Sequence, residues 1–134
     1  MIIPPDLKAR IAEEALKAYP NECCGILLGP NEREISKILP IINAFSEDER
    51  YHRFKIEPED LMRAERQAFQ DGLEVLGFYH SHPDHPAVPS EYDREQALPF
   101  YAYTIVEVHQ NRAGDFRLWR LKEDRTAFQE FFFS

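Results

Sequence analysis

The segment from residue 73 to Pro83 constrains the fold of this chain more than any other feature. It follows Gly72 as an apolar run that ends in His80-Ser81-His82-Pro83, and residues 73–82 are predicted to form a β-strand. Side chains two residues apart project from the same face of a strand. The residues expected on one face are Leu76, Phe78, His80 and His82. Because Pro83 cannot donate a ladder hydrogen bond, the strand should end there with two imidazoles side by side.

Short helices and strands, separated by Pro, Gly and Asn, are predicted before this segment. Apolar spacing predicts a helix over residues 7–19, ended by Pro20, and a second helix from Pro58 to Gly72. Apolar and β-branched runs predict paired strands over residues 23–28 and 34–42, with Asn31 in the turn between them.

After the histidine segment, residues 90–93 predict the start of a third helix. Two strands are expected over residues 103–109 and 116–121 around a turn at 111–115, followed by a short closing helix over 126–133. The predicted order is α-β-β-α-β-α-β-β, so the fold class is α/β, in the α+β arrangement of helices against one mixed sheet. No repeat or linker interrupts the sequence, so residues 1–134 are expected to form a single domain.

Composition limits the partners and the compartment. The formal charge is −8, from 24 acidic and 16 basic residues, and no stretch gathers Lys and Arg. Nucleic acid is therefore not an expected partner. No stretch approaches the roughly 20 apolar residues that cross a bilayer, and the N-terminus lacks a leader pattern. The expectation is a soluble, cytoplasmic protein without a membrane partner.

Cys23 and Cys24 are the two cysteines of the chain, and they are adjacent. A disulfide between neighbours would be strained, and an adjacent pair suits tetrahedral zinc poorly. Free cysteine is among the most buried residue types. Both are therefore expected to be reduced, buried, apolar-like side chains.

A candidate metal site lies where the histidine strand meets the third helix. Two imidazoles, from His80 and His82, and one carboxylate, from Asp93, form a known catalytic zinc set with a fourth position open for water. Bound zinc brings the pKa of its water to about 7. A carboxylate outside the metal shell would then act as general base, and Glu22 is the candidate.

Each of these residues also has a plain structural interpretation. A His-x-His pair can be a polar pair at a strand's rim, and Ser90 with Asp93 matches a helix capping box. Glu22 taken alone would be an exposed surface acid. His85 would be a solvated loop residue, so it is left out of the site.

The joint pattern is more specific than its parts. Ser90 lies seven residues after Pro83, and Asp93 follows three residues after Ser90. Together with an upstream Glu before an apolar, glycine-ended strand, this pattern resembles the JAMM (MPN-plus) metalloprotease family. The segment Glu22-Cys23-Cys24-Gly25-Ile26-Leu27-Leu28-Gly29 is also similar to the one that carries the base in bacterial stand-alone members.

The resemblance, which covers nearly the whole chain, implies both a fold and a set of roles. The fold is a mixed sheet flanked by helices and is similar to that of cytidine deaminases. One Zn2+ is bound by His80, His82 and Asp93. Glu22 activates the water, and the Ser90 hydroxyl steadies the oxyanion of the tetrahedral intermediate. Ser81, on the opposite strand face, is expected to be structural.

The resemblance also implies a substrate class. Family members cleave peptide or isopeptide bonds after the glycine-ending tail of a ubiquitin-like protein. Short chains such as this one resemble proteases that act on sulfur-carrier proteins with a Gly-Gly-type tail. Some of these proteases release cysteine from the C-terminus of the carrier. The carrier, the bond type and the oligomeric state, a homodimer included, stay open at this point.

Two other classes of protein are alternatives. Zinc deaminases have a similar fold, but their His-x-Glu and Pro-Cys-x-x-Cys ligand pattern is absent. A noncatalytic binding or scaffold module of the same fold is the second alternative. Such modules usually lack one or more of the metal ligands, whereas this chain retains His80, His82 and Asp93. The His-Glu-x-x-His pattern of thermolysin-type proteases is missing.

Overall fold

One mixed β-sheet organises the protein. The computed structural model describes residues 1–43 and 56–133. The strands follow the order β2-β1-β3-β4-β5-β6 across the sheet, and among them β3 and β4 are parallel while the other neighbours are antiparallel. Their bounds are β1 Cys24–Gly29, β2 Lys37–Ile41, β3 Glu74–Pro83, β4 Ala102–His109, β5 Arg112–Leu121 and β6 Phe128–Phe131.

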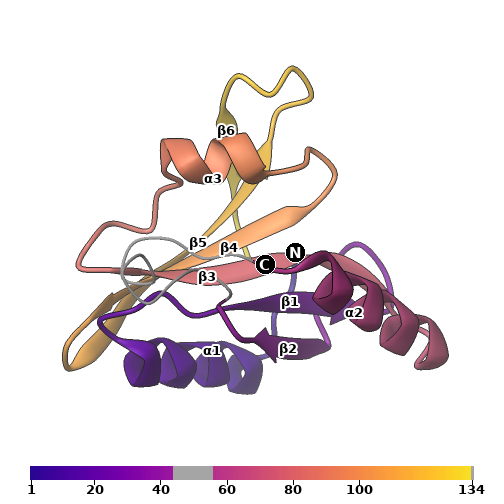
Figure 1. Ribbon diagram of the computed structural model, residues 1–134, viewed down its shortest axis with the longest axis horizontal. Coiled ribbons are helices and arrows are strands. Elements are labelled where there is room, and N and C mark those ends of the chain that lie inside the picture. Colours follow the sequence, from indigo (N-terminus) through magenta and orange to yellow (C-terminus); the bar gives the residue numbers. More distant parts are fainter. Residues whose placement is uncertain (44–55, 134) are drawn as a thin grey trace.

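Helices cover both faces of this sheet. They are α1 Pro5–Ala18, α2 Pro58–Gln70 and α3 Glu91–Gln96. In Figure 1, α1 lies on one side of the sheet and α3 on the other. The buried clusters agree, because α1 packs with one set of strand side chains while α2 and the end of α3 pack with others. The central strand β3 therefore has α1 on one face and, on the other, both α2 and the end of α3.

The face covered by α1 carries the largest buried cluster. Leu7, Ile11 and Ala15 form the buried stripe of the helix and pack with Leu27 and Tyr79 of the sheet. Burying each large aliphatic side chain stabilises the fold by about 1.5–3 kcal/mol. Tyr79 is completely buried and its hydroxyl donates to Glu14 Oε2 at 2.8 Å, which satisfies its polar atom inside the core.

Gly25 of β1 makes room for that ring. A Cβ atom at this position would lie 2.1 Å from the Tyr79 side chain. The register pairs Gly25 directly with Tyr79 across the antiparallel ladder. A large central side chain on β3 thus requires the smallest residue on β1.

Two smaller clusters lie on the opposite face. Ala64 and Ala68 of α2 pack on Ile26 and Leu28, whereas Ala97, at the end of α3, packs with residues of β4 and β5. Phe78 contacts both clusters and is only half-buried. It marks the place where neither helix covers the sheet completely.

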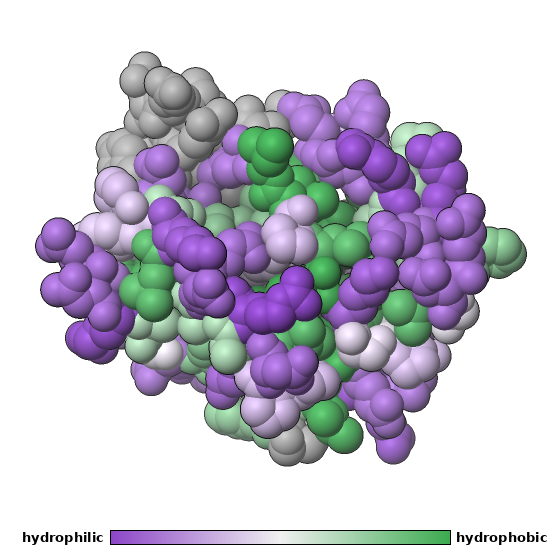
Figure 2. Space-filling view, turned by 90° about the horizontal axis from the view of Figure 1, so that it is seen from below, coloured by the Kyte–Doolittle hydropathy of each residue, from purple (hydrophilic) through white to green (hydrophobic). Residues whose placement is uncertain are grey.

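The surface on the α1 side is mainly hydrophilic. Figure 2 shows this face with hydrophobic residues scattered among polar ones rather than gathered in one patch. None of the helices in the described part of the chain combines the length and apolarity that crossing a membrane requires.

Most predicted elements are confirmed, and the closing helix is wrong. Residues 126–133 contain the strand β6, which pairs antiparallel with β5 so that Phe131 lies opposite Leu118. Aromatic side chains favour the half-buried surface of a sheet, and this contact overrides the local helical pattern. The order therefore gains a sixth strand where a helix was expected.

The turn predicted at residues 111–115 is also wrong. His109 pairs with Arg112, so the turn consists of Gln110 and Asn111 and β5 starts directly after it. Gly114, inside the predicted turn, belongs to the strand instead. A Cβ atom there would lie 2.5 Å from the Glu107 carboxylate, so the glycine allows this carboxylate to lie over the strand.

The predicted shared face of β3 is corrected at one residue. The register between β1 and β3 shifts between Leu27 and Leu28, which inserts an extra residue in β3 near Leu76. Leu76 therefore packs in the α1 cluster, whereas Phe78 packs on the opposite face. The bulge moves Leu76 away from the face that it was expected to share with the two histidines.

Both cysteines have the predicted character. Cys23 and Cys24 are buried and not joined by a disulfide. Burial raises the pKa of both thiols, to about 12 for Cys23. They remain protonated near neutral pH, which makes them poor nucleophiles and poor metal ligands.

Candidate metal centre

Three side-chain atoms converge at the end of β3. His80 Nε2 and His82 Nε2 lie 3.1 Å apart, and Asp93 Oδ2 lies 3.4 Å from the first and 3.2 Å from the second. Atoms bound at 2.0–2.1 Å to one tetrahedral zinc ion are separated by about 3.3 Å. The triangle therefore has the dimensions that a single tetrahedral metal ion requires.

The two histidines reach this point from one face of β3. They are the last two same-face residues before Pro83, with the parallel partner β4 beside them. His80 is 1% exposed and His82 8% exposed. Because β1 and β4 pair with this strand on its two sides, the backbone positions of the two histidines are fixed relative to each other.

A hydrogen bond orients the second imidazole. His82 Nδ1 lies 3.0 Å from the carbonyl oxygen of Pro86, to which it can only donate. In the neutral ring this leaves the Nε2 lone pair directed toward the other two atoms of the triangle. The Trp119 indole holds the same loop, since its Nε1 donates to the Ala87 carbonyl at 3.0 Å.

Asp93 is held by a helix cap. Ser90 Oγ accepts from the Asp93 amide at 3.1 Å, and Asp93 Oδ2 accepts from the Ser90 amide at 2.8 Å. The capping-box interpretation is thus confirmed. The same Oδ2 atom faces both imidazoles, so the cap fixes the direction of the carboxylate toward the histidines.

Glu22 reaches the same place from the segment directly before β1. The antiparallel register pairs Cys24 with His80, so Glu22, two residues earlier, lies across from His82. One potential ligand atom from each of Glu22, His80 and His82 lies within 4.8 Å of the others, and these three residues could hold a metal ion. Glu22 is only 4% exposed, so its interpretation as a surface acid is wrong.

Hydrogen bonds from two sides hold the backbone near Glu22. Ser81 Oγ accepts from the Cys23 amide at 2.9 Å, and the Ser81 amide donates to the Cys23 carbonyl at 3.1 Å. Asn43 Nδ2 donates to the Glu22 carbonyl at 3.2 Å. Ser81 therefore has the structural role that was predicted for it.

Burial and charge separate the protonation states of the site residues. Burial raises the pKa of Glu22 to about 8 and lowers the pKa of His80. Burial opposes ionisation of Asp93, but its contacts with His80 and His82 hold its pKa well below the ordinary value. Burial also lowers the pKa of His82, and the hydrogen bond and charge of Asp93 outweigh it and raise that pKa. An ionised Asp93 beside neutral His80 is the state that a divalent cation binds.

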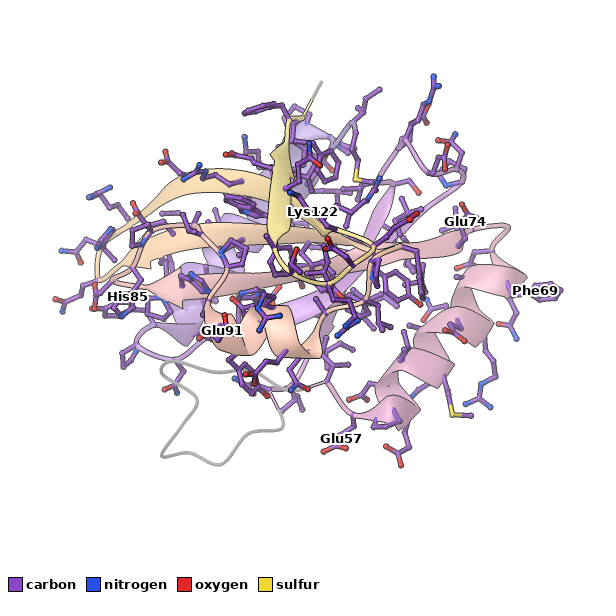
Figure 3. All side chains as sticks on the ribbon, turned by 90° about the horizontal axis from the view of Figure 1, so that it is seen from above. Glu57, Phe69, Glu74, His85, Glu91 and Lys122 are labelled. Atoms are coloured by element: carbon purple, nitrogen blue, oxygen red, sulfur yellow. The ribbon has the colours of Figure 1, made fainter. Side chains whose placement is uncertain are left out.

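The remaining histidines lie elsewhere. His85 is exposed at the periphery of the molecule (Figure 3). His109 contacts Asp84 and Glu107, each at 3.3 Å, on the partly exposed end of β4. His52 is outside the described residues.

Three contributors to the site were not predicted from the sequence. They are Trp119, the carbonyl of Pro86 and the side chain of Asn43, which support the loop, His82 and Glu22 respectively. Each of these contacts involves a main-chain carbonyl, which has no sequence signature. Trp119 is the single tryptophan of the chain, but its separation from the loop by 32 positions conceals the contact.

Sequence comparison agrees with this architecture. The chain matches the family of prokaryotic homologs of the JAB domain over residues 4–122. A relative named desampylase, from Pyrococcus furiosus, is 29% identical over 122 residues, which are 91% of this chain and 82% of the relative. A Thermus thermophilus relative named "Probable TtuB-protein conjugate cleaving protease" is 29% identical over 105 residues, which are 78% of this chain and 68% of the relative.

Solved structures share the fold. A protein from Salinibacter ruber superimposes with a TM-score of 0.76 at 35% identity and covers 99% of this chain and 90% of its own. A JAB1/MPN domain protein from Archaeoglobus fulgidus has a TM-score of 0.63 at 21% identity, with 99% and 94% covered. At that identity, the second likeness concerns the fold alone.

A mixed sheet with a His-x-His-Pro strand end beside a serine-capped helix defines a hydrolase of the JAMM type. Within this class, the chain belongs to the family of prokaryotic homologs of the JAB domain. The resemblance drawn from the motif is thereby confirmed.

Proposed function

We propose that this protein is a zinc-dependent peptidase or isopeptidase that cuts after the glycine-ending tail of a ubiquitin-like or sulfur-carrier protein. The observation that carries the proposal is the convergence of His80 Nε2, His82 Nε2 and Asp93 Oδ2 within 3.4 Å of one another. These three residues hold one Zn2+ ion. When bound, the ion supplies Lewis acidity and lowers the pKa of a water molecule to about 7.

Glu22 is the general base in this proposal. Its buried carboxylate lies beside the histidines, and the positive charge of a bound ion would favour its ionised form, which is the form that accepts a proton. It accepts the proton of the attacking water and later passes it to the amine of the leaving group. The backbone hydrogen bonds around Cys23 keep it in place during both transfers.

Ser90 is the proposed donor to the oxyanion. Its Oγ accepts a hydrogen bond from the Asp93 amide, so its own hydroxyl proton remains available for donation. The residue is exposed at the start of α3, where a substrate carbonyl can approach. Removing such a donor in other hydrolases slows turnover about 10²–10³-fold.

The substrate class follows from the relatives' names and from the motif. One relative is named as a protease that cleaves TtuB-protein conjugates, and another is named a desampylase. We extend this to a small ubiquitin-like carrier with a Gly-Gly-type tail, joined to its partner by a peptide or isopeptide bond. Release of a single cysteine from the carrier is a narrower form of the same reaction.

Two variants test the assignment together. Purified wild-type protein should contain about one zinc ion per chain and should cleave a fusion joined through a Gly-Gly-tailed carrier. His82→Ala should lose the zinc, whereas Glu22→Gln should keep zinc and lose turnover. Metal content by mass spectrometry and cleavage by gel provide the two readings. If the wild type holds no zinc and cuts no faster than Glu22→Gln, the protein is a binding module instead.

A further inference from the structure

An apolar cavity opens beside the proposed metal ligands. Its volume is about 370 Å³, and it lies between the N-terminal half of α2 and the α3 region. Figure 3 marks these two helices by Glu57 and Glu91. His80 and Asp93 form part of its wall, so the cavity is continuous with the catalytic centre proposed above.

The floor of this cavity is aromatic. Phe78 of β3 lies 5.0 Å from the ring of Tyr101 in an edge-on arrangement and 5.7 Å from the ring of Tyr103 in a stacked one. Tyr103 is buried, and its hydroxyl accepts from the Leu98 amide at 2.9 Å, so the floor is anchored. Phe78 and Tyr101 are half-buried, and both line the cavity.

The side walls are aliphatic and come from the two helices. Leu61 of α2 stands on one side, and Leu98, which is 42% exposed, follows α3 on the other. The cavity is within the range of 300–1,000 Å³ that small ligands and side chains occupy in proteins. A tail of glycine residues alone would leave this apolar surface in contact with water.

We propose that this cavity is a specificity subsite for one large apolar side chain, leucine or phenylalanine, of the substrate within three residues of the cleaved bond. The inference rests on the proposed function and deepens it, because it adds a side-chain requirement to a glycine-ending tail. Burial of such a side chain should raise kcat/KM by about ten- to a hundredfold over alanine. The lining of the cavity is mainly apolar, so an acidic side chain would lose its hydration there and is disfavoured.

A peptide series tests the subsite on the enzyme itself. Carrier-tail substrates carry leucine, alanine or aspartate in turn at each of three positions on both sides of the cleaved bond. We expect one position at which leucine exceeds alanine at least tenfold and aspartate is cut most slowly. Equal rates for leucine and alanine at every position, with cleavage still observed, overturn the subsite and leave the proposed function intact.

Matched variants on one helix localise the effect. Leu61→Trp fills the cavity from α2, whereas Met62→Trp adds the same bulk at the neighbouring position, where Met62 is 58% exposed. The leucine preference should fall to within twofold in Leu61→Trp and stay unchanged in Met62→Trp. A preference that survives in Leu61→Trp contradicts the assignment to this cavity.

Binding without turnover separates the two proposals. The same leucine and alanine peptides are titrated by calorimetry into Glu22→Gln protein, whose cavity residues are intact. The leucine peptide should bind at least fivefold more tightly, and Leu61→Trp in that background should remove the difference. Equal affinities, or no measurable binding of either peptide, overturn the subsite whether or not the wild type cleaves any substrate.

Discussion

His82 Nε2 and Asp93 Oδ2 lie 3.2 Å apart although they belong to a central strand and to the first turn of a helix. The Nδ1–H of His82 is directed to the Pro86 carbonyl, so in the neutral ring two acceptors face each other across this distance. Such a pair is favourable only when a proton or a cation lies between the two atoms. The close approach of the Asp93 carboxylate to His82 Nε2 therefore raises the pKa of His82, and it also favours a cation at the proposed metal site.

Asp93→Asn tests the charge in this pair. The amide oxygen can still accept from the Ser90 amide, so the cap on α3 is largely kept while the anionic ligand is lost. We expect zinc affinity to fall at least a hundredfold with little change in the thermal stability of the metal-free protein. Competition with a chelator and thermal melts in EDTA measure the two quantities. Unchanged zinc affinity would remove Asp93 from the ligand set.

Two substitutions at Ser90 separate its cap from its proposed role with the oxyanion. Ser90→Ala should cost about 1 kcal/mol of unfolding free energy through loss of the cap, whereas Ser90→Gly should cost only a few tenths. Both lack the hydroxyl, so both should lower kcat about 10²–10³-fold with zinc retained. Urea unfolding and steady-state kinetics provide the comparison. Full activity in Ser90→Gly would leave Ser90 with the cap alone.

Trp119→Phe tests support of the loop that carries the Pro86 carbonyl. The variant keeps an aromatic ring in the buried cluster and loses the hydrogen bond to Ala87. Loss of a hydrogen bond that orients a metal ligand typically weakens metal affinity about 10–100-fold. We expect the lower end of this range, because Trp119 holds the loop through the Ala87 carbonyl and not through His82 itself. Ile105→Val, in the same cluster, is the control for packing and should leave zinc affinity unchanged. Equal zinc affinity in both variants would limit Trp119 to packing.

Glu14 gives a pH dependence that is independent of the metal. Burial raises its pKa above the ordinary 4.5, although the hydrogen bond from Tyr79 lowers it. A raised pKa in the folded state means that its stabilising contribution is complete below pH 4.5 and is lost as pH rises through the raised value. The unfolding free energy in EDTA should therefore fall less steeply with pH in Glu14→Gln than in the wild type.

The control for this pH dependence lies next to it on α1. Glu13 is paired with Lys17 on the exposed side of the helix, and its side chain is 64% exposed. Glu13→Gln should reproduce the wild-type slope of unfolding free energy against pH. A parallel slope in Glu14→Gln and the wild type would show that Glu14 titrates as an ordinary surface carboxylate.

The elements with strong periodicity were predictable from the sequence. In α1 and in β3, apolar residues recur with the period of a helix or a strand, because each element must place one face against the core. The predictions were wrong where pairing with another strand determines the structure. Leu76 changes face through a bulge against β1, and residues 128–131 become a strand because the preceding strand β5 offers an edge to pair with. Neither pairing has a signature in the residues that it affects.

The spacing from His80 to Asp93 determined the candidate ligands by sequence alone, since a strand end, a short loop and a helix start leave few other arrangements. The place of Glu22 was decided by tertiary structure. Only the pairing of β1 with β3 brings this carboxylate out of water and opposite His82, and burial then raises its pKa. The apolar cavity likewise exists only because α2 and α3 cover the sheet incompletely over Phe78. Local spacing encodes a motif, whereas burial and cavities arise from contacts between distant segments.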